Sequence, residues 1–348
     1  MNLPFTASFS LVFGLALALA LVLTPVAGAL GQRLGLVDRP SPRRVHPGAV
    51  PRTGGIALYT AFILATLATV FLPGRWFPPR LDPNETVRLA ALLIGATFAF
   101  AVGLLDDRYE LSPGPQFASQ FIASLIAMAG LIFIQIVNNP FTNLPMRLPW
   151  IVVYGVTVFW FAGMMNTVNF LDGLDGLATG VGAILCAVLA AHMIREEQYS
   201  VALLPLALLG ATLGFLPFNF HPSRIIMGSS GSYFLGFALA ALGIIAGARM
   251  ATVLLVLGLP IMDVAWLIWS RWRRKKPLGL GGRDHLHHRL LAMGLSQRQI
   301  VLGYYAFCAA FGLLALLLSS RLYKLLLLIA LAAVTLAFLW WVEKRTGG

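Results

Sequence analysis

Runs of about 20 apolar residues recur along almost the whole chain and constrain its fold more than any other feature. A helix of this length crosses about 30 Å of hydrocarbon at about 1.5 Å per residue. Lipid offers a polypeptide backbone no hydrogen-bond partners, so only helices and closed barrels span it. The sequence therefore predicts an all-α, polytopic transmembrane bundle that forms a single domain over residues 1–348.

The apolar runs predict about eleven spans. Their approximate limits are 7–30, 53–72, 88–105, 116–137, 149–166, 176–194, 200–217, 231–248, 250–270, 299–319 and 322–342. Breaks such as Ser112-Pro-Gly-Pro have the composition of turns, so the division does not depend on hydropathy alone. Composition agrees, because 11% of the residues are charged, against about 25% in soluble domains.

Lys and Arg are unevenly distributed among the loops between these runs. When the spans are threaded alternately with the N-terminus outside, most of the 25 Lys and Arg fall after the odd-numbered spans. The positive-inside rule makes that side cytoplasmic, and an odd number of spans places the C-terminus there as well. The net charge of +12 is attributed to topology and to contact with anionic membrane lipids. Nucleic acid is not an expected partner.

Polar residues gather in clusters that all fall on this cytoplasmic side. The clusters are residues 38–52, Asp106 with Asp107, Asn166 to Asp175, Asn219 to Ser232, and Asp284 to His288. The limits of the spans do not depend on these clusters. Their common side therefore predicts one functional face.

Two adjacent carboxylates, Asp106 and Asp107, end an apolar run. Adjacent anions repel one another, and a divalent cation relieves this; Mg²⁺ held jointly with phosphate oxygens suits such hard oxygen ligands. The alternative is a solvated helix end with Arg108 as counter-ion.

The second cluster repeats a polar residue at every third position, from Asn166 and Asn169 to Asp172 and Asp175. Residues at this spacing share a helix face. Gly173 and Gly176 would let the backbone approach a phosphate or nucleotide closely. The alternative is a set of polar contacts between helices.

The last two clusters fit anion binding in different ways. In the first, Asn219 precedes a Gly/Ser segment that leads into a helix, where free backbone N–H groups would hold an anion; a flexible loop with a Ser N-cap is the alternative. The last cluster, rich in histidine, is predicted to form hydrogen bonds to a diphosphate or nucleotide. Zinc binding and a solvated basic loop are the alternatives. The residues of this cluster are Arg283, His285, His287 and His288.

In this order, the motifs resemble those of the polyprenyl-phosphate N-acetylhexosamine-1-phosphate transferases, glycosyltransferase family 4. The resemblance covers about residues 37 to 295. It is carried by Asp38-Arg-Pro40, Arg44-Val-His46, Pro51-Arg-Thr-Gly-Gly55, Asp106-Asp107, Asn166 to Leu177, Met227 to Gly236 and His285-Leu-His287-His288. The His-x-His-His form and the eleven spans are more similar to the branch that starts O-antigen, enterobacterial common antigen and teichoic acid linkage synthesis than to the muramoyl-pentapeptide branch.

The resemblance implies transfer of a sugar 1-phosphate, most simply N-acetylglucosamine 1-phosphate, from a UDP-N-acetylhexosamine to undecaprenyl phosphate. The products would be an undecaprenyl-diphosphate-linked sugar and UMP, at the cytoplasmic side of a bacterial inner membrane. The implied metal is Mg²⁺, with Mn²⁺ as the alternative. The many apolar helix faces also make a homodimer an expectation.

Roles for individual residues follow from the same resemblance. Asp106, Asp107, Asp172 and Asp175 would be the catalytic acids and metal ligands. The substrate-binding residues would be Arg44, His46, Arg52, Asn166, Asn169, Asn219, Arg283, His285, His287 and His288. For Arg43, Arg44, His46 and Arg52, which would bind phosphate, contact with lipid headgroups is the alternative.

One position departs from the family pattern. Ser229 follows Met227-Gly228 where the family has an Asp that binds Mg²⁺, and a neutral hydroxyl is a poor replacement for that carboxylate. An engineered substitution, a natural variant whose other Asp residues hold the metal, and a catalytically silent homologue all fit this departure. Rival readings of the whole chain are a lipid-linked transporter, with polar groups spread across the membrane depth, and a membrane scaffold.

Overall fold

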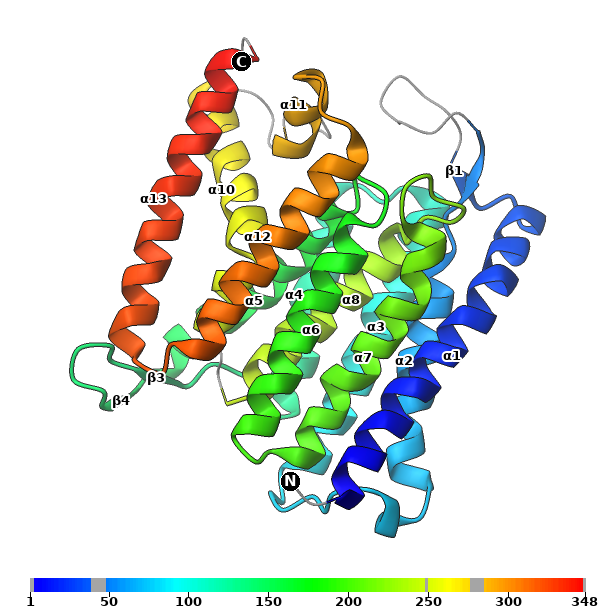
Figure 1. The fold of residues 1–348 in the computed structure, drawn as a ribbon, viewed down its shortest axis with the longest axis vertical. Helices are drawn as coiled ribbons and strands as arrows, with labels where there is room; N and C mark the ends of the chain where they lie inside the picture. The colour runs from blue at the N-terminus through cyan, green and yellow to red at the C-terminus, as the bar shows by residue number, and fades with distance from the viewer. Residues whose placement is uncertain (1–2, 39–47, 248–249, 276–284, 347–348) are drawn as a thin grey trace.

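The computed structural model describes residues 3–38, 48–247, 250–275 and 285–346. The all-α prediction is confirmed. The described helices are α1 Leu3–Arg33, α2 Gly54–Phe71, η1 Gly74–Trp76, α3 Glu85–Tyr109, α4 Pro113–Ala129, α5 Trp150–Leu171, α6 Leu177–Arg195, α7 Tyr199–Asn219, α8 Gly228–Ile245, α9 Met250–Val256, α10 Gly258–Arg273, α11 Leu286–Ala292, α12 Gln297–Leu317 and α13 Arg321–Arg345. Two antiparallel hairpins, β1 Val37–Asp38 with β2 Val50–Pro51 and β3 Ile136–Asn138 with β4 Pro145–Arg147, join helices at opposite ends of the bundle (Figure 1).

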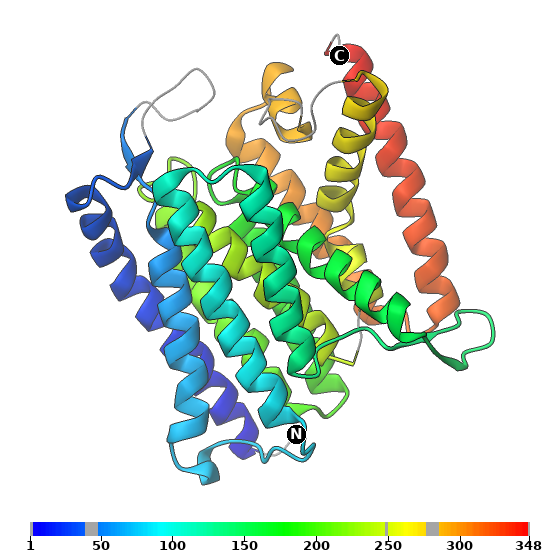
Figure 2. The same ribbon diagram turned by 180° about the vertical axis from the view of Figure 1, so that it is seen from behind.

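Within the described residues, 9 helices are long and apolar enough to cross a membrane, and the bent pair α9 and α10 brings the number to 10. The long helices run back and forth along one direction, and the N- and C-termini lie at opposite ends (Figures 1 and 2). We call the end that carries β1, α11 and the C-terminus the α11 end. The helix ends that bear the predicted polar clusters all meet there.

Two predicted spans differ from the observed helices. The fourth, 116–137, is wrong at its C-terminal limit, because α4 ends at Ala129 after 17 residues. Leu131 then takes a left-handed φ of 62° and the β3–β4 hairpin follows. The ninth, 250–270, is two helices joined at Leu257 with a bend of 78°. Pro260 lies in the first turn of α10, where a helix tolerates proline because an N–H there has no partner within the helix.

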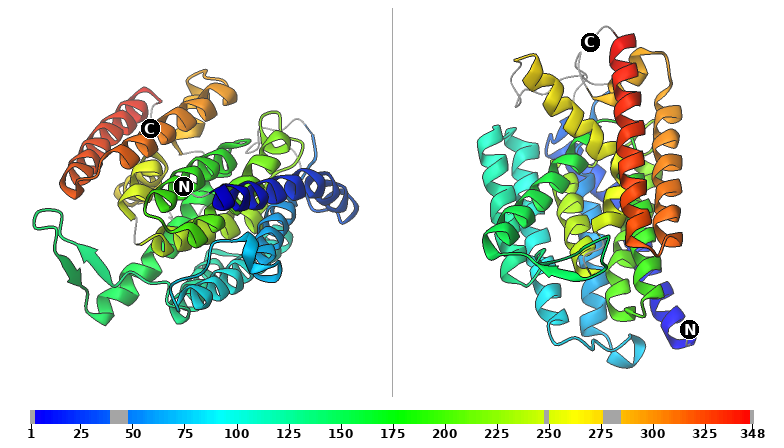
Figure 3. Two further views of the ribbon diagram at one scale, coloured as in Figure 1. Left: turned by 60° about the horizontal axis from the view of Figure 1, so that its bottom comes forward. Right: turned by 90° about the vertical axis from the view of Figure 1, so that its left-hand side faces the viewer.

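Helix α8 forms the centre of the bundle. All its residues from Gly228 to Ile244 are buried, and it packs against α2, α3 and α5. Close packing requires a small residue at Gly103 of α3, because a Cβ there would lie 2.4 Å from the carbonyl oxygen of Ser229. In the tilted left-hand view of Figure 3, α1 and α13 lie on the outside of this arrangement. The N-terminus of α8 is thereby fixed among the ends of its neighbours.

Candidate active site

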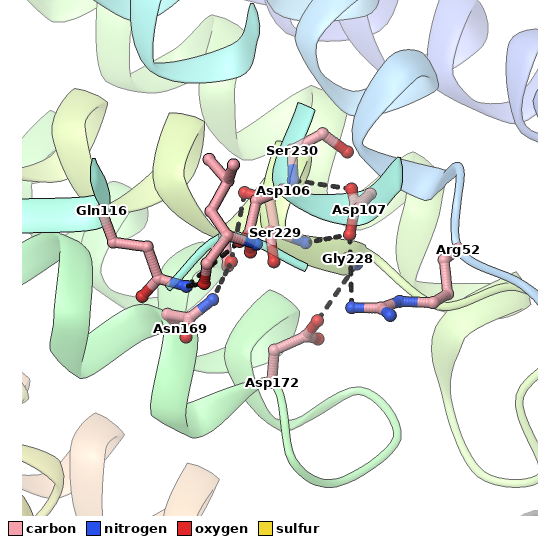
Figure 4. Close-up of polar contacts among 11 residues, drawn as sticks. Arg52, Asp106, Asp107, Gln116, Asn169, Asp172, Gly228, Ser229 and Ser230 are labelled. Carbon is pink, nitrogen blue, oxygen red and sulfur yellow. Dashed lines mark hydrogen bonds and ion pairs between the residues drawn. The ribbon is translucent and has the colours of Figure 1, made fainter. Parts of the chain in front are cut away.

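The C-terminal ends of α3 and α5 meet the N-terminus of α8 at the α11 end. Alternating helix directions bring these three ends together, although they lie far apart in the sequence. Figure 4 shows Asp107 from α3, Asp172 from the end of α5 and Arg52 around the first residues of α8. We call Asp107, Asp172, Arg52 and the α8 N-terminus the carboxylate centre.

Asp107 binds the backbone at the start of α8. Its two carboxylate oxygens accept hydrogen bonds from the N–H groups of Ser229, at 2.7 Å, and Ser230, at 2.9 Å. Arg52 Nη2 lies 3.4 Å from one of these oxygens. Free N–H groups and the helix dipole make a helix N-terminus favourable for an anion. The Gly/Ser segment was predicted to hold an anion, and in the structure its N–H groups hold carboxylates of the same chain.

Asp172 binds the same turn from the opposite side. It follows the last residue of α5, and its carboxylate accepts a hydrogen bond from the Gly228 N–H at 3.1 Å. Burial of this carboxylate and the nearby charge of Asp107 raise the pKa of Asp172 well above its usual value. Gly228 itself has φ +74°, and a Cβ there would lie 2.8 Å from the Asp107 carboxylate oxygens. Only glycine fits between the two acids.

The carboxylate centre places two acids beside one cation. Within the described part of the chain, Arg52 pairs with Asp107 and no cation pairs with Asp172. Two neighbouring carboxylates suit a divalent cation such as Mg²⁺, whose charge would favour their ionised forms. The described residues contain no group of three or more His, Cys, Asp or Glu side chains arranged to hold a metal. Ser229, 6% exposed, supplies an N–H and a hydroxyl here.

Asp106 points away from its neighbour. Its carboxylate accepts hydrogen bonds from the Leu111 N–H at 2.9 Å and from Gln116 Nε2 at 3.1 Å. Gln116 Nε2 also donates to the Leu111 carbonyl at 2.8 Å. These bonds organise the turn between α3 and α4. The two adjacent acids therefore have separate tasks, and Gln116 is a site residue that sequence patterns did not indicate.

The amides of α5 face neighbouring helices. Asn166 exchanges hydrogen bonds with Gln120 of α4, at 2.8 and 3.2 Å. Asn169 Nδ2 donates to Ser232 Oγ of α8 at 2.9 Å. For Asn166 the alternative interpretation, a polar contact between helices, therefore applies. Asn169 lies beside the carboxylate centre in Figure 4.

Asp175 organises a second loop next to the centre. It accepts hydrogen bonds from Ser223 Oγ at 2.9 Å and from the Ser223 N–H at 3.2 Å, and His221 Nδ1 lies 2.8 Å from it. Asn219, only 2% exposed, accepts from Thr179 Oγ1 at 2.6 Å and donates to the Ile225 carbonyl at 3.0 Å. Both residues shape the 219–227 loop that leads into α8.

The predicted histidines form an imidazole cluster, His285, His287 and His288, around α11. Asp263 of α10 holds its start, because one carboxylate oxygen lies 3.1 Å from His285 Nδ1 and the other accepts the Leu286 N–H at 2.8 Å. The sequence patterns did not indicate Asp263, although an acid inside an apolar span is itself a sign of function. The ring centroids of His285 and His287 are 5.5 Å apart, and those of His287 and His288 are 4.4 Å apart.

His287 links this cluster to the turn after α5. Its side chain is 2% exposed, and neither ring nitrogen has a hydrogen-bond partner among the described residues. A Cβ on Gly173 would lie 2.8 Å from His287 Nε2, so the ring packs directly against the turn between Asp172 and Asp175. Burial, with the neighbouring imidazoles, lowers the pKa of His287 well below its usual value. The predicted residues Arg43, Arg44, His46 and Arg283 lie outside the described residues.

Comparisons with known proteins give the same family as the motifs. Residues 89–247 match the family model described as Glycosyl transferase family 4. A probable undecaprenyl-phosphate N-acetylglucosaminyl 1-phosphate transferase of Bacillus subtilis is 33% identical over 314 residues, which cover 88% of this chain and 84% of the relative. A decaprenyl-phosphate N-acetylglucosaminephosphotransferase of Mycobacterium tuberculosis is 32% identical, over 81% of this chain and 76% of the relative. A phospho-N-acetylmuramoyl-pentapeptide-transferase of Listeria monocytogenes is 29% identical, over 73% and 79%.

Proposed function

Because this chain belongs to glycosyl transferase family 4, as a polyprenyl-phosphate N-acetylhexosamine-1-phosphate transferase, we propose that it transfers N-acetylglucosamine 1-phosphate from a UDP-sugar to undecaprenyl phosphate. The carboxylate centre carries this proposal. It joins two carboxylates, Arg52 and a helix N-terminus at one end of a membrane-spanning bundle. A water-soluble nucleotide sugar and a lipid phosphate at headgroup depth can both reach such a place.

In the proposed reaction an oxygen of the lipid phosphate attacks the sugar-bearing phosphorus of the UDP-sugar. The bond from this phosphorus to the bridging diphosphate oxygen breaks, and UMP leaves with the bonding electron pair. The sugar keeps its anomeric C–O bond. A phosphate monoester has a second pKa near 6, so most of the lipid phosphate is already a dianion at about pH 7. Positioning and charge compensation are therefore the main tasks of the protein.

The residues of the centre suit these tasks. Asp107 and Asp172 would hold Mg²⁺, which when bound offsets the charge of the reacting phosphates. Arg52, whose side chain is 20% exposed, would donate to phosphate oxygens. His285 and its neighbours would donate to the diphosphate or nucleotide from α11. Asp106 and Asp175 would maintain the flanking turns to which they are hydrogen-bonded.

We place the protein in a bacterial inner membrane with this site on the cytoplasmic side. The excess of Lys and Arg at that side of the threaded chain supports the orientation. The bend between α9 and α10 does not favour a transporter, because Val253, Val256 and Leu257 around it are buried and apolar. The polar contacts of the centre gather at one end of the bundle, as an interfacial enzyme requires.

UMP release tests the proposal directly. Purified full-length protein is incubated with UDP-N-acetylglucosamine, undecaprenyl phosphate and Mg²⁺, with and without EDTA, beside its Ser229→Asp form. We expect UMP that depends on the lipid phosphate and disappears with EDTA, in larger amount from Ser229→Asp. Absence of UMP from both forms with every UDP-N-acetylhexosamine would show that the chain is not such a transferase.

A further inference from the structure

The ends of α10 and α13 form an exposed surface of indoles and cations at the α11 end. The two helices pack side by side and reach this end together (Figures 1 and 2). We call it the basic–aromatic surface. Its residues are Trp269, Trp272 and Arg273 of α10, and Trp340, Trp341, Lys344 and Arg345 of α13.

Three cation–π pairs order this surface. Arg273 lies 4.7 Å from the ring centroid of Trp269. Lys344 and Arg345 lie 4.0 Å and 4.9 Å from the rings of Trp340 and Trp341. Each pair joins residues four positions apart, which neighbour each other on a helix. Stacking occupies the face of a guanidinium and leaves its N–H edges free to donate.

Two of the three cations of this surface, Lys344 and Arg345, keep a positive charge that no carboxylate among the described residues compensates. Glu343 is 7% exposed and accepts a hydrogen bond from Trp266 Nε1 at 2.8 Å. It also forms ion pairs with Arg274 and with Arg273, and the distance to Arg273 is 3.6 Å. The Glu343 carboxylate is therefore already paired with groups of α10. Among the described residues, no carboxylate pairs with Lys344 or Arg345.

The indoles indicate the depth of this surface in a membrane. Trp272 is 71% exposed and Trp340 52%, and below them α13 exposes Val334 and Phe338. Trp residues gather where hydrocarbon gives way to headgroups. Cations in the last turn of such helices therefore lie level with lipid phosphates.

We propose that the basic–aromatic surface binds anionic phospholipids of the surrounding leaflet. The indoles would contact the glycerol and upper acyl region, and the stacked cations would donate to the phosphate. Charge complementarity carries the inference, since cations held in place by stacking pay less ordering entropy when they bind. It does not depend on the transferase reaction.

Brominated lipids, which quench nearby indoles, test this inference. The full chain is reconstituted in phosphatidylcholine bilayers that contain either brominated phosphatidylglycerol or brominated phosphatidylcholine at the same mole fraction. Four of the 8 Trp residues lie on the surface, so preferential binding of the anionic lipid strengthens quenching. We expect stronger quenching by the brominated phosphatidylglycerol, and a loss of about fivefold in its relative affinity for each cation removed. Lys344→Gln with Arg345→Gln is the test variant.

Arg75→Gln with Arg147→Gln is the matched control, because it removes two exposed cations at the opposite end, in η1 and β4. The control should keep the preference, as should the conservative Lys344→Arg with Arg345→Lys variant. Lys344→Gln alone gives a milder second variant. Equal quenching of the parent by the two lipids, or equal loss of preference in the test and control variants, would overturn the proposal.

Discussion

The carboxylate centre and the imidazole cluster lie at the same end of the molecule but are fixed by different means. Asp107 and Asp172 bind backbone N–H groups of α8, whose position is set by its packing on every side. α11, a helix of only 7 residues, is fixed by Asp263, a side chain of the neighbouring α10. The carboxylate centre is therefore held by the backbone of the buried helix α8, whereas the start of α11 is held by the side chain of Asp263 and by packing against α12 and α13.

This difference suggests a division of labour. Charge compensation of reacting phosphates needs preorganised groups, and backbone N–H groups of a buried helix supply them without reorganisation. Contacts to a nucleotide can tolerate small adjustments. We therefore expect substitutions in the centre to change turnover, and substitutions around α11 to affect binding of the donor more than turnover.

The largest effect is expected from Asp107→Asn. Asparagine presents an amide N–H₂ to one of the two backbone donors of α8 and removes the ion pair with Arg52. UMP release should fall by about 10³-fold, the size typical of removing an electrostatic contact to the reacting groups. Asp106→Asn is the matched control, because its remaining oxygen can still accept from Leu111 and Gln116. Equal losses in the two variants would contradict separate tasks for the adjacent acids.

Ser229→Asp should act in the opposite direction. It adds a carboxylate beside Asp107 and Asp172, which raises the charge available for a divalent cation. We expect a rise in turnover of about 10²-fold and a lower Mg²⁺ concentration at half-maximal rate. Titration of UMP release with Mg²⁺ measures both. Ser229→Asn, similar in shape but neutral, should give neither, and an unchanged rate in Ser229→Asp would show that this chain does not need a third acid.

The sequence predicts the helices and acid motifs of this protein but not the contacts between them. Spans, the common end of the polar clusters and the acid motifs follow from hydropathy and spacing, which are local properties. The partners of each acid do not follow, because Asp107 meets residues more than one hundred positions away and Asp106 turns toward Gln116. The break after α4 and the bend at Leu257 depend on tertiary packing that periodicity cannot reveal.

Asp263→Asn should have a smaller effect that appears mainly in KM for the UDP-sugar. Asparagine can still accept the Leu286 N–H, so α11 remains capped, but its amide offers a donor to His285 Nδ1, whereas a carboxylate favours the tautomer with a proton on Nδ1. Loss of such a carboxylate–histidine contact typically costs about tenfold. Initial rates over a range of UDP-sugar concentrations separate KM from kcat. A loss confined to kcat would place His285 with the reacting groups rather than with the nucleotide.

The smallest effect concerns the pH dependence of stability. Because the pKa of His287 is lowered in the folded protein, the unfolded chain binds a proton as pH falls below about 6.5 while the folded protein does not. Stability contributed by this residue is therefore complete above about pH 6.5 and decreases toward lower pH, with a slope of at most about 1.4 kcal/mol per pH unit. His287→Gln should flatten this slope when unfolding midpoints are measured between about pH 5 and 7.5, whereas His288→Gln should keep most of it. An unchanged slope in His287→Gln would mean that this imidazole takes up its proton at the same pH in the folded and unfolded protein, and that its burial does not lower its pKa.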